Sequence, residues 1–250
     1  MSRGALIVRG IALVVLVAFL MTPQSFTWLF APLTINNAPP IYNQGSLIEL
    51  ALNHLAIVAV ATVAATIVAV GLAIFVSRPV GAEFLSLSRS IANLGQTFPP
   101  LAVLALAVPV LGFGTAPTLV ALFLYGLLPI FENALVGLTT LPATVIDAAD
   151  GMGMTPLQRL RSVELPLALP VILSGIRLSA VISMGTATIG STVAARTLGE
   201  VIIAGLTSNN FAFVLQGGAI VAALAVLVSD GFGVVERAAL KRAGRVPTAA

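Results

Sequence analysis

Charged side chains in this sequence gather in one segment, residues 139–166, which lies between two long apolar runs. They are Asp147, Asp150, Arg159, Arg161 and Glu164. By composition alone, such a segment is either an ordinary amphipathic loop with a solvated face or an element that another chain approaches.

The local pattern inside residues 139–166 predicts a short helix, a glycine turn and a second helix. Gly151 and Gly153 end the first helix, because glycine readily adopts the positive φ at which many helices terminate. Thr155 caps the second helix and Pro156 occupies its first position, where the missing N–H has no partner to lose. The small pair Ala148–Ala149 leaves room for another chain to approach closely.

No other part of the sequence carries a pattern typical of catalysis or metal binding. There is no cysteine, which excludes disulfides and thiolate sites, and the single histidine, His54, cannot form a histidine-rich metal site alone. The P-loop pattern G-x-x-x-x-G-K-[ST] is missing and the only lysine is Lys241, so the chain cannot bind ATP in that manner. We expect a protein that is not an enzyme and has no cofactor of its own.

The composition indicates that lipid, and not water, surrounds much of the chain. Of its 250 residues, 58% are hydrophobic and 8% are charged. Soluble domains carry about 25% charged residues. Since a spanning helix takes about 20 apolar residues, this length allows about six transmembrane helices. The predicted fold class is all-α, a polytopic membrane protein.

Apolar runs and polar breaks divide the chain into four parts. Residues 1–22 are expected to be a retained first transmembrane helix, because no small-x-small cleavage site follows the run. Residues 23–48 form an external loop, 49–236 the core with its polar loop at 139–166, and 237–250 a basic tail. The spans expected in the core are residues 50–76, 91–111, 117–138, 167–189 and 211–228, with a short polar stretch at 81–89 and an interfacial helix at 201–206.

Basic residues fall almost entirely on one side of this six-span arrangement. Eleven of the twelve lysines and arginines lie near the termini, in residues 77–89, or in and just after residues 139–166, and Arg196 alone lies on the other side. Cytoplasmic loops carry such an excess of basic residues. Both termini are therefore expected in the cytoplasm, and the net charge of +3 reflects orientation in a membrane and not binding to nucleic acid.

Some residues within the expected spans are candidates for lining a solute pathway. They are Gln96, Thr97, Pro99, Pro100, Glu132, Thr186 and Thr188. The two prolines break the third span, and a broken helix is tolerated in a membrane where it lines a cavity or packs against protein. An acid within a span indicates function, although Arg177 is an equally good structural partner for Glu132. The threonines could instead bond back to their own helix.

Three further polar residues have ordinary structural interpretations. His54 is expected near the outer interface. Arg196 and Glu200 are four positions apart, a spacing that favours a pair along one helix, and a contact with a partner protein is the alternative.

The polar segment resembles the E-A-A–x₃–G–x₉–I-x-L-P signature of the permeases of binding-protein-dependent ABC importers. It reads Asp147-Ala148-Ala149, then Gly153, then Val163-Glu164-Leu165-Pro166, with every spacing kept and with Asp and Val replacing Glu and Ile. The resemblance implies the fold of a type I ABC importer transmembrane domain, with this segment docking on the ATPase. The coupling residues it implies are Asp147, Ala148, Ala149, Gly151, Gly153, Met154, Thr155, Pro156, Arg159, Glu164, Leu165 and Pro166.

Other stretches are similar to the osmoprotectant subfamily, which imports glycine betaine, choline or carnitine. They include residues 95–102, 112–114 and 185–189, whereas residues 193–199 depart from the glycine-rich sequence usual there. The resemblance implies a bacterial inner-membrane complex with an ATPase dimer, a periplasmic or lipid-anchored solute-binding protein and a second permease, identical or homologous. An ion-coupled secondary transporter, a membrane enzyme and an assembly subunit without a pathway are the alternatives.

Overall fold

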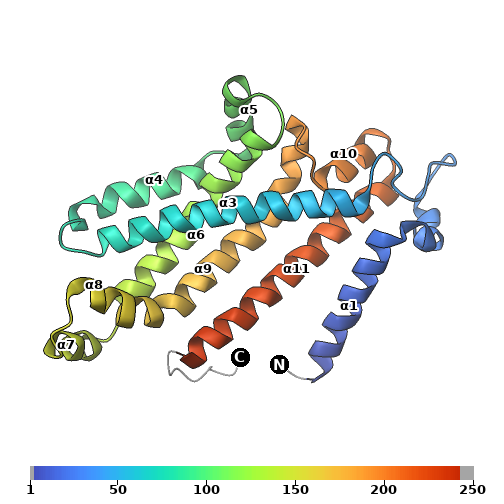
Figure 1. Cartoon of the computed structure of the whole chain (residues 1–250). Coiled ribbons are helices and arrows are strands. Elements are labelled where there is room, and N and C mark those ends of the chain that lie inside the picture. Colours follow the sequence, from blue (N-terminus) through green and yellow to red (C-terminus); the bar gives the residue numbers. More distant parts are fainter. Residues whose placement is uncertain (1–2, 243–250) are drawn as a thin grey trace. The chain divides into compact units, whose positions relative to one another are not determined.

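The computed structural model describes residues 3–242, and within them every regular element is helical (Figure 1). The longer helices are α1 (Arg3–Met21), α3 (Leu47–Val76), α4 (Leu85–Thr97), α5 (Pro100–Leu111), α6 (Thr115–Thr139), α9 (Leu165–Thr186) and α11 (Phe211–Arg242). The shorter ones are α2 (Thr27–Phe30), α7 (Ala143–Gly151), α8 (Pro156–Arg159) and α10 (Gly199–Thr207). A π-helical segment, Leu160–Glu164, joins α8 to α9, and 3-10 turns cover Pro23–Phe26, Ala31–Leu33, Ala82–Phe84 and Ala187–Val193.

Within residues 3–242, four helical stretches are long and apolar enough to cross a membrane: Leu47–Val76, Thr115–Thr139, Pro156–Val193 and Phe211–Arg242. Two bent pairs raise the number to six if each pair counts as one span. The helices of the second pair, Ala82–Thr97 and Pro100–Leu111, meet at 95°. The predicted all-helical fold and the break at Pro99 and Pro100 are confirmed.

Two expectations about the spans are wrong. The stretch 81–89 is not a polar loop, because a 3-10 turn begins at Ala82 and α4 at Leu85, and the third span is consequently two helices at a steep angle. The last helix does not end near residue 228. It continues through Arg242, because the last residues of α11, Glu236 to Arg242, are all strong helix formers although several of them are charged. The remainder of the expected tail, residues 243–250, lies outside the described residues.

The chain divides into two compact units, and helices α3, α6, α9 and α11 each contribute a part to both. The first unit contains Met1–Val60, Pro100–Leu122 and Ser183–Leu227. Its core includes the ring of Phe19, which contacts Phe26 and Phe30 at centroid distances of 5.2 and 5.4 Å. The segment that precedes α3 is anchored in this unit, because the backbone N–H of Tyr42 donates to the side chain of Gln216 at 3.1 Å.

The second unit contains Ala61–Pro99, Phe123–Ile182 and Val228–Ala250. Fully buried alanines recur every four residues along α3, at positions 65, 69 and 73. They pack with Phe131 of α6 and Ile172 of α9 in one apolar cluster. Small side chains allow membrane helices to approach closely, so this stripe explains the tight packing of the helices that carry the polar segment.

Candidate functional site

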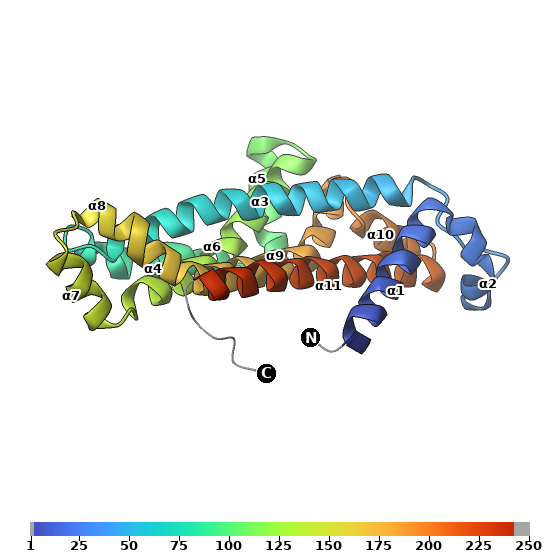
Figure 2. The ribbon, with the colours of Figure 1, turned by 60° about the horizontal axis from the view of Figure 1, so that its bottom comes forward.

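The polar segment forms α7, a tight turn and α8, which project as a short excursion between the ends of α6 and α9 (Figures 1 and 2). Helix α7 ends in a Schellman turn. The N–H of Gly153 donates to the carbonyl of Asp150 at 2.9 Å, and the N–H of Met154 donates to that of Ala149 at 3.2 Å. Gly153 has φ of +75°, as this turn requires. Gly151 remains within α7 and does not share the positive φ expected of it.

Helix α8 begins with the predicted cap. Thr155 accepts a hydrogen bond from the backbone N–H of Gln158 at 3.3 Å, and the Gln158 side chain accepts one from the N–H of Thr155 at 2.8 Å. This reciprocal pair is a capping box, and Pro156 occupies the first helical turn. The turn and the cap, which are both made of short-range hydrogen bonds, help to fix the direction of α8 relative to α7.

An ion-pair network ties this segment to the end of α3. Arg159 contacts both oxygens of Asp150 at 2.5 and 2.6 Å, and its Nε donates to Glu164 at 2.9 Å. Glu164 also accepts two hydrogen bonds from Arg78, one of them at 3.0 Å. The Glu164 side chain is only 4% exposed, so its charge depends on these two arginines. Side chains of α7, α8, the π-helical segment and the turn after α3 thus form one connected group.

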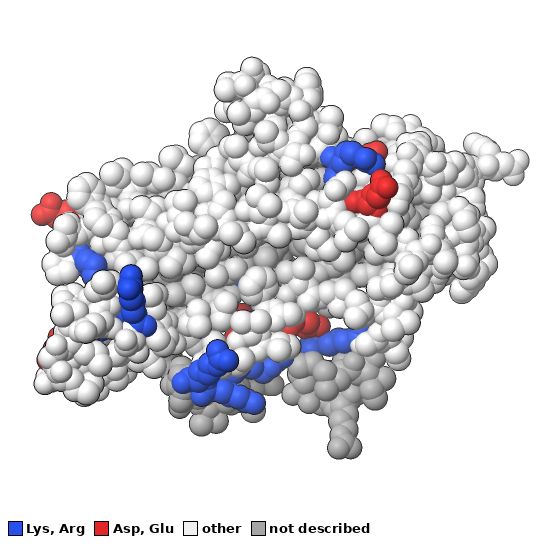
Figure 3. All heavy atoms as spheres, in the orientation of Figure 1, with Lys and Arg blue, Asp and Glu red and all other residues white. Residues whose placement is uncertain are grey.

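The outer side of the segment is apolar and exposed. Met152 and Leu157 are 69% and 53% exposed, and Ala148 beside them on α7 is also exposed. Ala149 is instead buried against this chain, so only one of the two small residues is open to a partner. In the face shown in Figure 3, basic side chains gather over the end of α11 and beside α8, and most other surface is uncharged. A polar segment that ends in an exposed apolar tip is suited to docking.

The remaining coupling candidates lie on α7, in the turn after it and at the start of α9, all in the second unit. Asp147 is exposed on α7, Met154 is half-buried in the turn, and Leu165 and Pro166 form the first residues of α9. The interpretation of the sequence missed the part played by two residues, Arg78 and Asp150. No local pattern in the sequence links Arg78 to a carboxylate 86 positions away.

The pathway candidates make mostly local bonds. Gln96 donates to the carbonyl of Tyr125 at 3.4 Å, and Thr97 donates to that of Leu94 in its own helix. Thr188 donates to the carbonyl of Gly185 at 2.7 Å, in agreement with the structural alternative. Thr186 is half-buried at the end of α9, and Pro99 and Pro100 mark the break between α4 and α5.

Glu132 does not pair with Arg177, as one interpretation expected. Arg89 of α4 binds it through two hydrogen bonds at 2.6 and 3.1 Å, since the helical stretch that replaces the expected loop brings this arginine alongside α6. Arg177 instead donates to Ser229 at 3.0 Å and to Glu236 at 3.3 Å, both on α11. The unexpected length of α11 is what supplies Glu236.

His54, in the first unit, has the structural role expected of it. It is fully buried, where its Nε2 lies 2.9 Å from the carbonyl of Met184 and its Nδ1 accepts from the N–H of Leu198 at 3.4 Å. The expected pair of Arg196 and Glu200 is wrong, because Arg196 contacts Glu49 at 3.6 Å and Glu200 accepts from Tyr42 at 3.5 Å. Burial and, second to it, the nearby Glu200 carboxylate raise the pKa of the Tyr42 hydroxyl.

Residues 69–237 match the sequence profile of a family described as "Binding-protein-dependent transport system inner membrane component". The chain is 43% identical to the osmoprotectant import permease protein OsmY of Salmonella typhimurium over 185 residues, 74% of this chain and 78% of that protein. It is 37% identical to the choline transport system permease protein OpuBB of Bacillus subtilis, over 78% of this chain and 89% of that protein.

Solved structures share the fold at lower identity. An inward-facing structure of the MetNI methionine ABC transporter superposes with a TM-score of 0.70 at 22% identity, covering 77% of this chain and 95% of that one. An amino acid ABC transporter solved with histidines superposes with a TM-score of 0.65 at 18% identity, covering 88% and 98%. At these identities the likeness concerns the fold of the transmembrane domain.

Proposed function

Because this chain belongs to the family of binding-protein-dependent transport system inner membrane components, we propose that it forms the pathway by which a small quaternary-ammonium solute enters a bacterial cell. The chain is a multi-pass membrane protein and a permease subunit of an ABC transporter, a transport component and not an enzyme. The proposal adds the solute, the partners and the residues that couple them.

The observation that carries the choice of solute is the identity to permeases named for such compounds. Besides the osmoprotectant and choline permeases, a carnitine transport permease protein, OpuCD of Listeria monocytogenes, is 38% identical over 74% of this chain. Glycine betaine, choline and carnitine share a trimethylammonium group. We therefore propose this class of compatible solute as the cargo.

The segment from Asp147 to Pro166 is the proposed contact with the ATPase. Its exposed tip at Met152 and Leu157 supplies an apolar surface, and the capping box and Schellman turn give it a fixed shape. The network through Arg159, Glu164 and Arg78 gives a route from that tip to α3 and α9. Closure of the ATPase pair would then shift the equilibrium between inward-open and outward-open states through these contacts.

The complete importer in this proposal contains two permease subunits, two ATPase subunits that bind the ATP, and an external solute-binding protein. Both termini face the cytoplasm, on the side that the basic residues favour. The polar segment and the ATPase then lie on that same side. Gln96, Thr97, Pro99, Pro100, Glu132, Thr186 and Thr188 remain candidates for the pathway itself.

Reconstitution of the importer tests the proposal. The chain is purified with the ATPase and solute-binding protein of its importer and placed in proteoliposomes. Uptake of radiolabelled glycine betaine, choline and carnitine is measured with ATP supplied to the ATPase side, and methionine serves as the unrelated solute. We expect ATP-dependent uptake of at least one trimethylammonium compound and none of methionine.

A second arm of the same experiment replaces ATP with a sodium or proton gradient. Uptake that follows the ion gradient and persists without ATP would contradict the proposal and favour a secondary transporter. ATP-dependent uptake of methionine but of no trimethylammonium compound would leave the permease assignment intact and overturn the choice of solute.

A further inference from the structure

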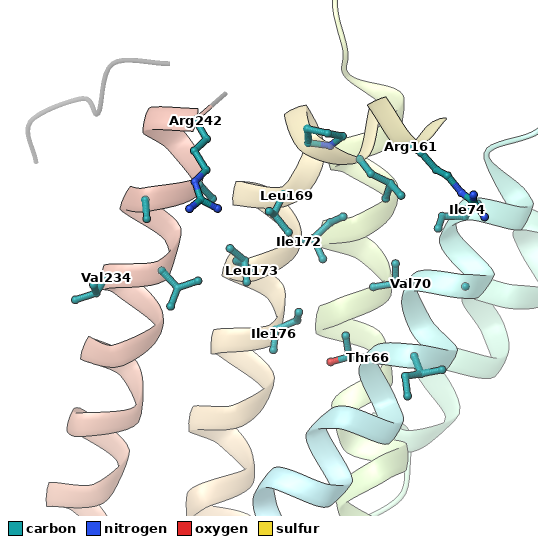
Figure 4. Close-up of a pocket in the computed structure, with 17 residues that line it drawn as sticks. Thr66, Val70, Ile74, Arg161, Leu169, Ile172, Leu173, Ile176, Val234 and Arg242 are labelled. Atoms are coloured by element: carbon teal, nitrogen blue, oxygen red, sulfur yellow. The ribbon is translucent and has the colours of Figure 1, made fainter. Parts of the chain in front are cut away.

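A long apolar groove of about 1070 Å³ runs along the second unit between α3, α9 and α11 (Figure 4). Its lining is almost entirely aliphatic, with Val70 and Ile74 from α3, Leu169 and Leu173 from α9, and Val234 from α11 among the residues. The groove opens at the surface. Ile67 is 69% exposed and Val234 is 59% exposed.

Two basic side chains stand at one end of this groove. Arg161, from the π-helical segment, and Arg242, the last described residue of α11, lie at the same end, with Thr66 toward the other end (Figure 4). Both arginines are exposed, and the lining residues include no acidic side chain. The hydroxyl of Thr66 donates a hydrogen bond to the carbonyl of Thr62 in its own helix, at 2.7 Å. The polarity of the groove is therefore confined to two positive charges at one end.

The length of the groove corresponds to one leaflet of a bilayer. Its lining covers residues 66–74 of α3 and 165–176 of α9, which rise about 12 and 16 Å at 1.5 Å per residue. The hydrocarbon core of a membrane is about 30 Å thick, so one leaflet contributes about 15 Å. When the aliphatic lining lies in the acyl-chain region, the two arginines lie at the depth of the headgroups.

We propose that this groove binds an anionic phospholipid, with an acyl chain along α3, α9 and α11 and the acidic headgroup at the end that carries Arg161 and Arg242. Basic pockets between transmembrane helices bind acidic headgroups in this manner, and guanidinium groups bind phosphate through paired hydrogen bonds. Arg161 precedes Glu164 in the polar segment and Arg242 ends α11. The bound lipid therefore joins the polar segment to the last helix.

Charge and length favour a lipid over a helix of a second copy. A helix that packs along α3 and α9 would use contacts over the full membrane thickness, whereas this groove extends over about half of that length. A second copy would also bring its own basic residues to an end where the lining already carries two arginines and no acidic side chain. An acidic headgroup neutralises that end, and its chain fills the aliphatic part.

Native mass spectrometry of the detergent-purified full chain tests the proposal. The protein is stripped of lipid and titrated with phosphatidylglycerol or with phosphatidylcholine of the same acyl chains. We expect tighter binding of phosphatidylglycerol, and a decrease of about 10- to 30-fold in its affinity when Arg161→Gln and Arg242→Gln are combined, from about 1 kcal/mol per basic residue. Phosphatidylcholine binding should change little in that variant.

Matched substitutions separate this site from general attraction to the surface. Lys241→Gln removes a neighbouring exposed charge that does not line the groove, and it should leave the affinity unchanged. Gly71→Leu places a side chain in the groove, where a Cβ meets no atom within 4 Å, and it should weaken the binding of both lipids. Gly231→Leu on α11 meets equally open space outside the lining and should not.

Two results would overturn the proposal. One is equal loss of phosphatidylglycerol from the Lys241→Gln and Arg242→Gln variants, which would show diffuse attraction. The other is a disulfide-linked dimer formed in membranes by Val235→Cys in this cysteine-free chain, which would show that a second copy covers the groove.

Discussion

The guanidinium of Arg78 and the carboxylate of Glu164, 86 positions apart in the chain, are joined by two hydrogen bonds. Arg78 directly follows the last turn of α3, whereas Glu164 ends the π-helical segment before α9. The same carboxylate accepts a hydrogen bond from Arg159. Helix α8 is therefore connected to the end of α3 by charge-assisted bonds, as well as to α9 through the backbone.

Replacement of Arg78 by Gln should disable the importer while the protein remains in the membrane. Glu164 would keep only Arg159, and a hydrogen bond to a charged group contributes about 1.5–3 kcal/mol. We expect normal abundance by immunoblot, with most solute uptake and most stimulation of the ATPase by loaded binding protein lost. Glu83→Gln, at an exposed position in the turn before α4, serves as the control. Wild-type uptake by Arg78→Gln would show that the pair is not part of the coupling route.

Gly153→Leu should abolish uptake without loss of abundance, because φ of +75° strains a branched side chain by about 1–3 kcal/mol. Gly151→Leu is the matched control, since a Cβ at either glycine meets no atom within 4 Å and only Gly153 has a positive φ. Gly153→Asn should retain activity, because asparagine tolerates that conformation. Uptake and immunoblots for the three variants are the measurement. Equal activity of the two leucine variants would exclude the turn as the reason for this glycine.

Gly95→Ala should destabilise the bent third span. A Cβ at this position of α4 would lie 2.1 Å from the carbonyl oxygen of Leu124 in α6, so the two helices would have to separate. Overpacking of this kind costs about 1–3 kcal/mol. The unfolding midpoint in detergent should fall by several degrees, whereas Gly231→Ala, in open space, should leave it unchanged or raise it. An unchanged midpoint for both variants would mean that α4 does not pack this closely on α6.

Single cysteines report the proposed orientation. Asn43→Cys and Thr115→Cys should react with an impermeant thiol reagent added outside intact cells, whereas Ser86→Cys and Ser162→Cys should react only after permeabilisation. All four positions are exposed in the structure, so access depends on the side of the membrane and not on burial. Because the natural sequence contains no cysteine, the unsubstituted protein should not react with the thiol reagent. Labelling of Ser162→Cys from outside would contradict the proposed orientation and indicate the opposite one.

The sequence was sufficient to predict those parts of the fold that depend on short-range chemistry. The long apolar runs predicted α3, α6 and α9 to within a few residues, and Thr155-Pro156 predicted the start of α8. Hydropathy failed where a helix continues through polar residues, as α11 does beyond residue 228 and α4 does before residue 91. At both boundaries, the start of α4 and the end of α11, helix propensity and tertiary packing determine where the helix stops, and apolarity does not.

The same division applies to the candidate site. Gly153 and the cap at Thr155 follow from local backbone rules, so the sequence predicted them correctly. The partners of Glu132 and Glu164 did not follow, because an ion pair between distant helices depends on which helix faces cross. The sequence offered Arg177 as one possible partner of Glu132, whereas the angle of α4 brings Arg89 to it.

The π-helical segment Leu160–Glu164 is the place where this long helical stretch can change its length at the least geometric cost. A π turn bonds each residue to the fifth one along and so holds one residue more than an α-helical turn. Within regular α-helix, deletion of one residue rotates everything before it by about 100° around the axis, at 3.6 residues per turn. Deletion of one residue within the π turn would instead restore regular α-helix and leave its two flanks facing nearly as before. Evolutionary loss of a single residue is therefore expected to be accepted here more readily than within α9.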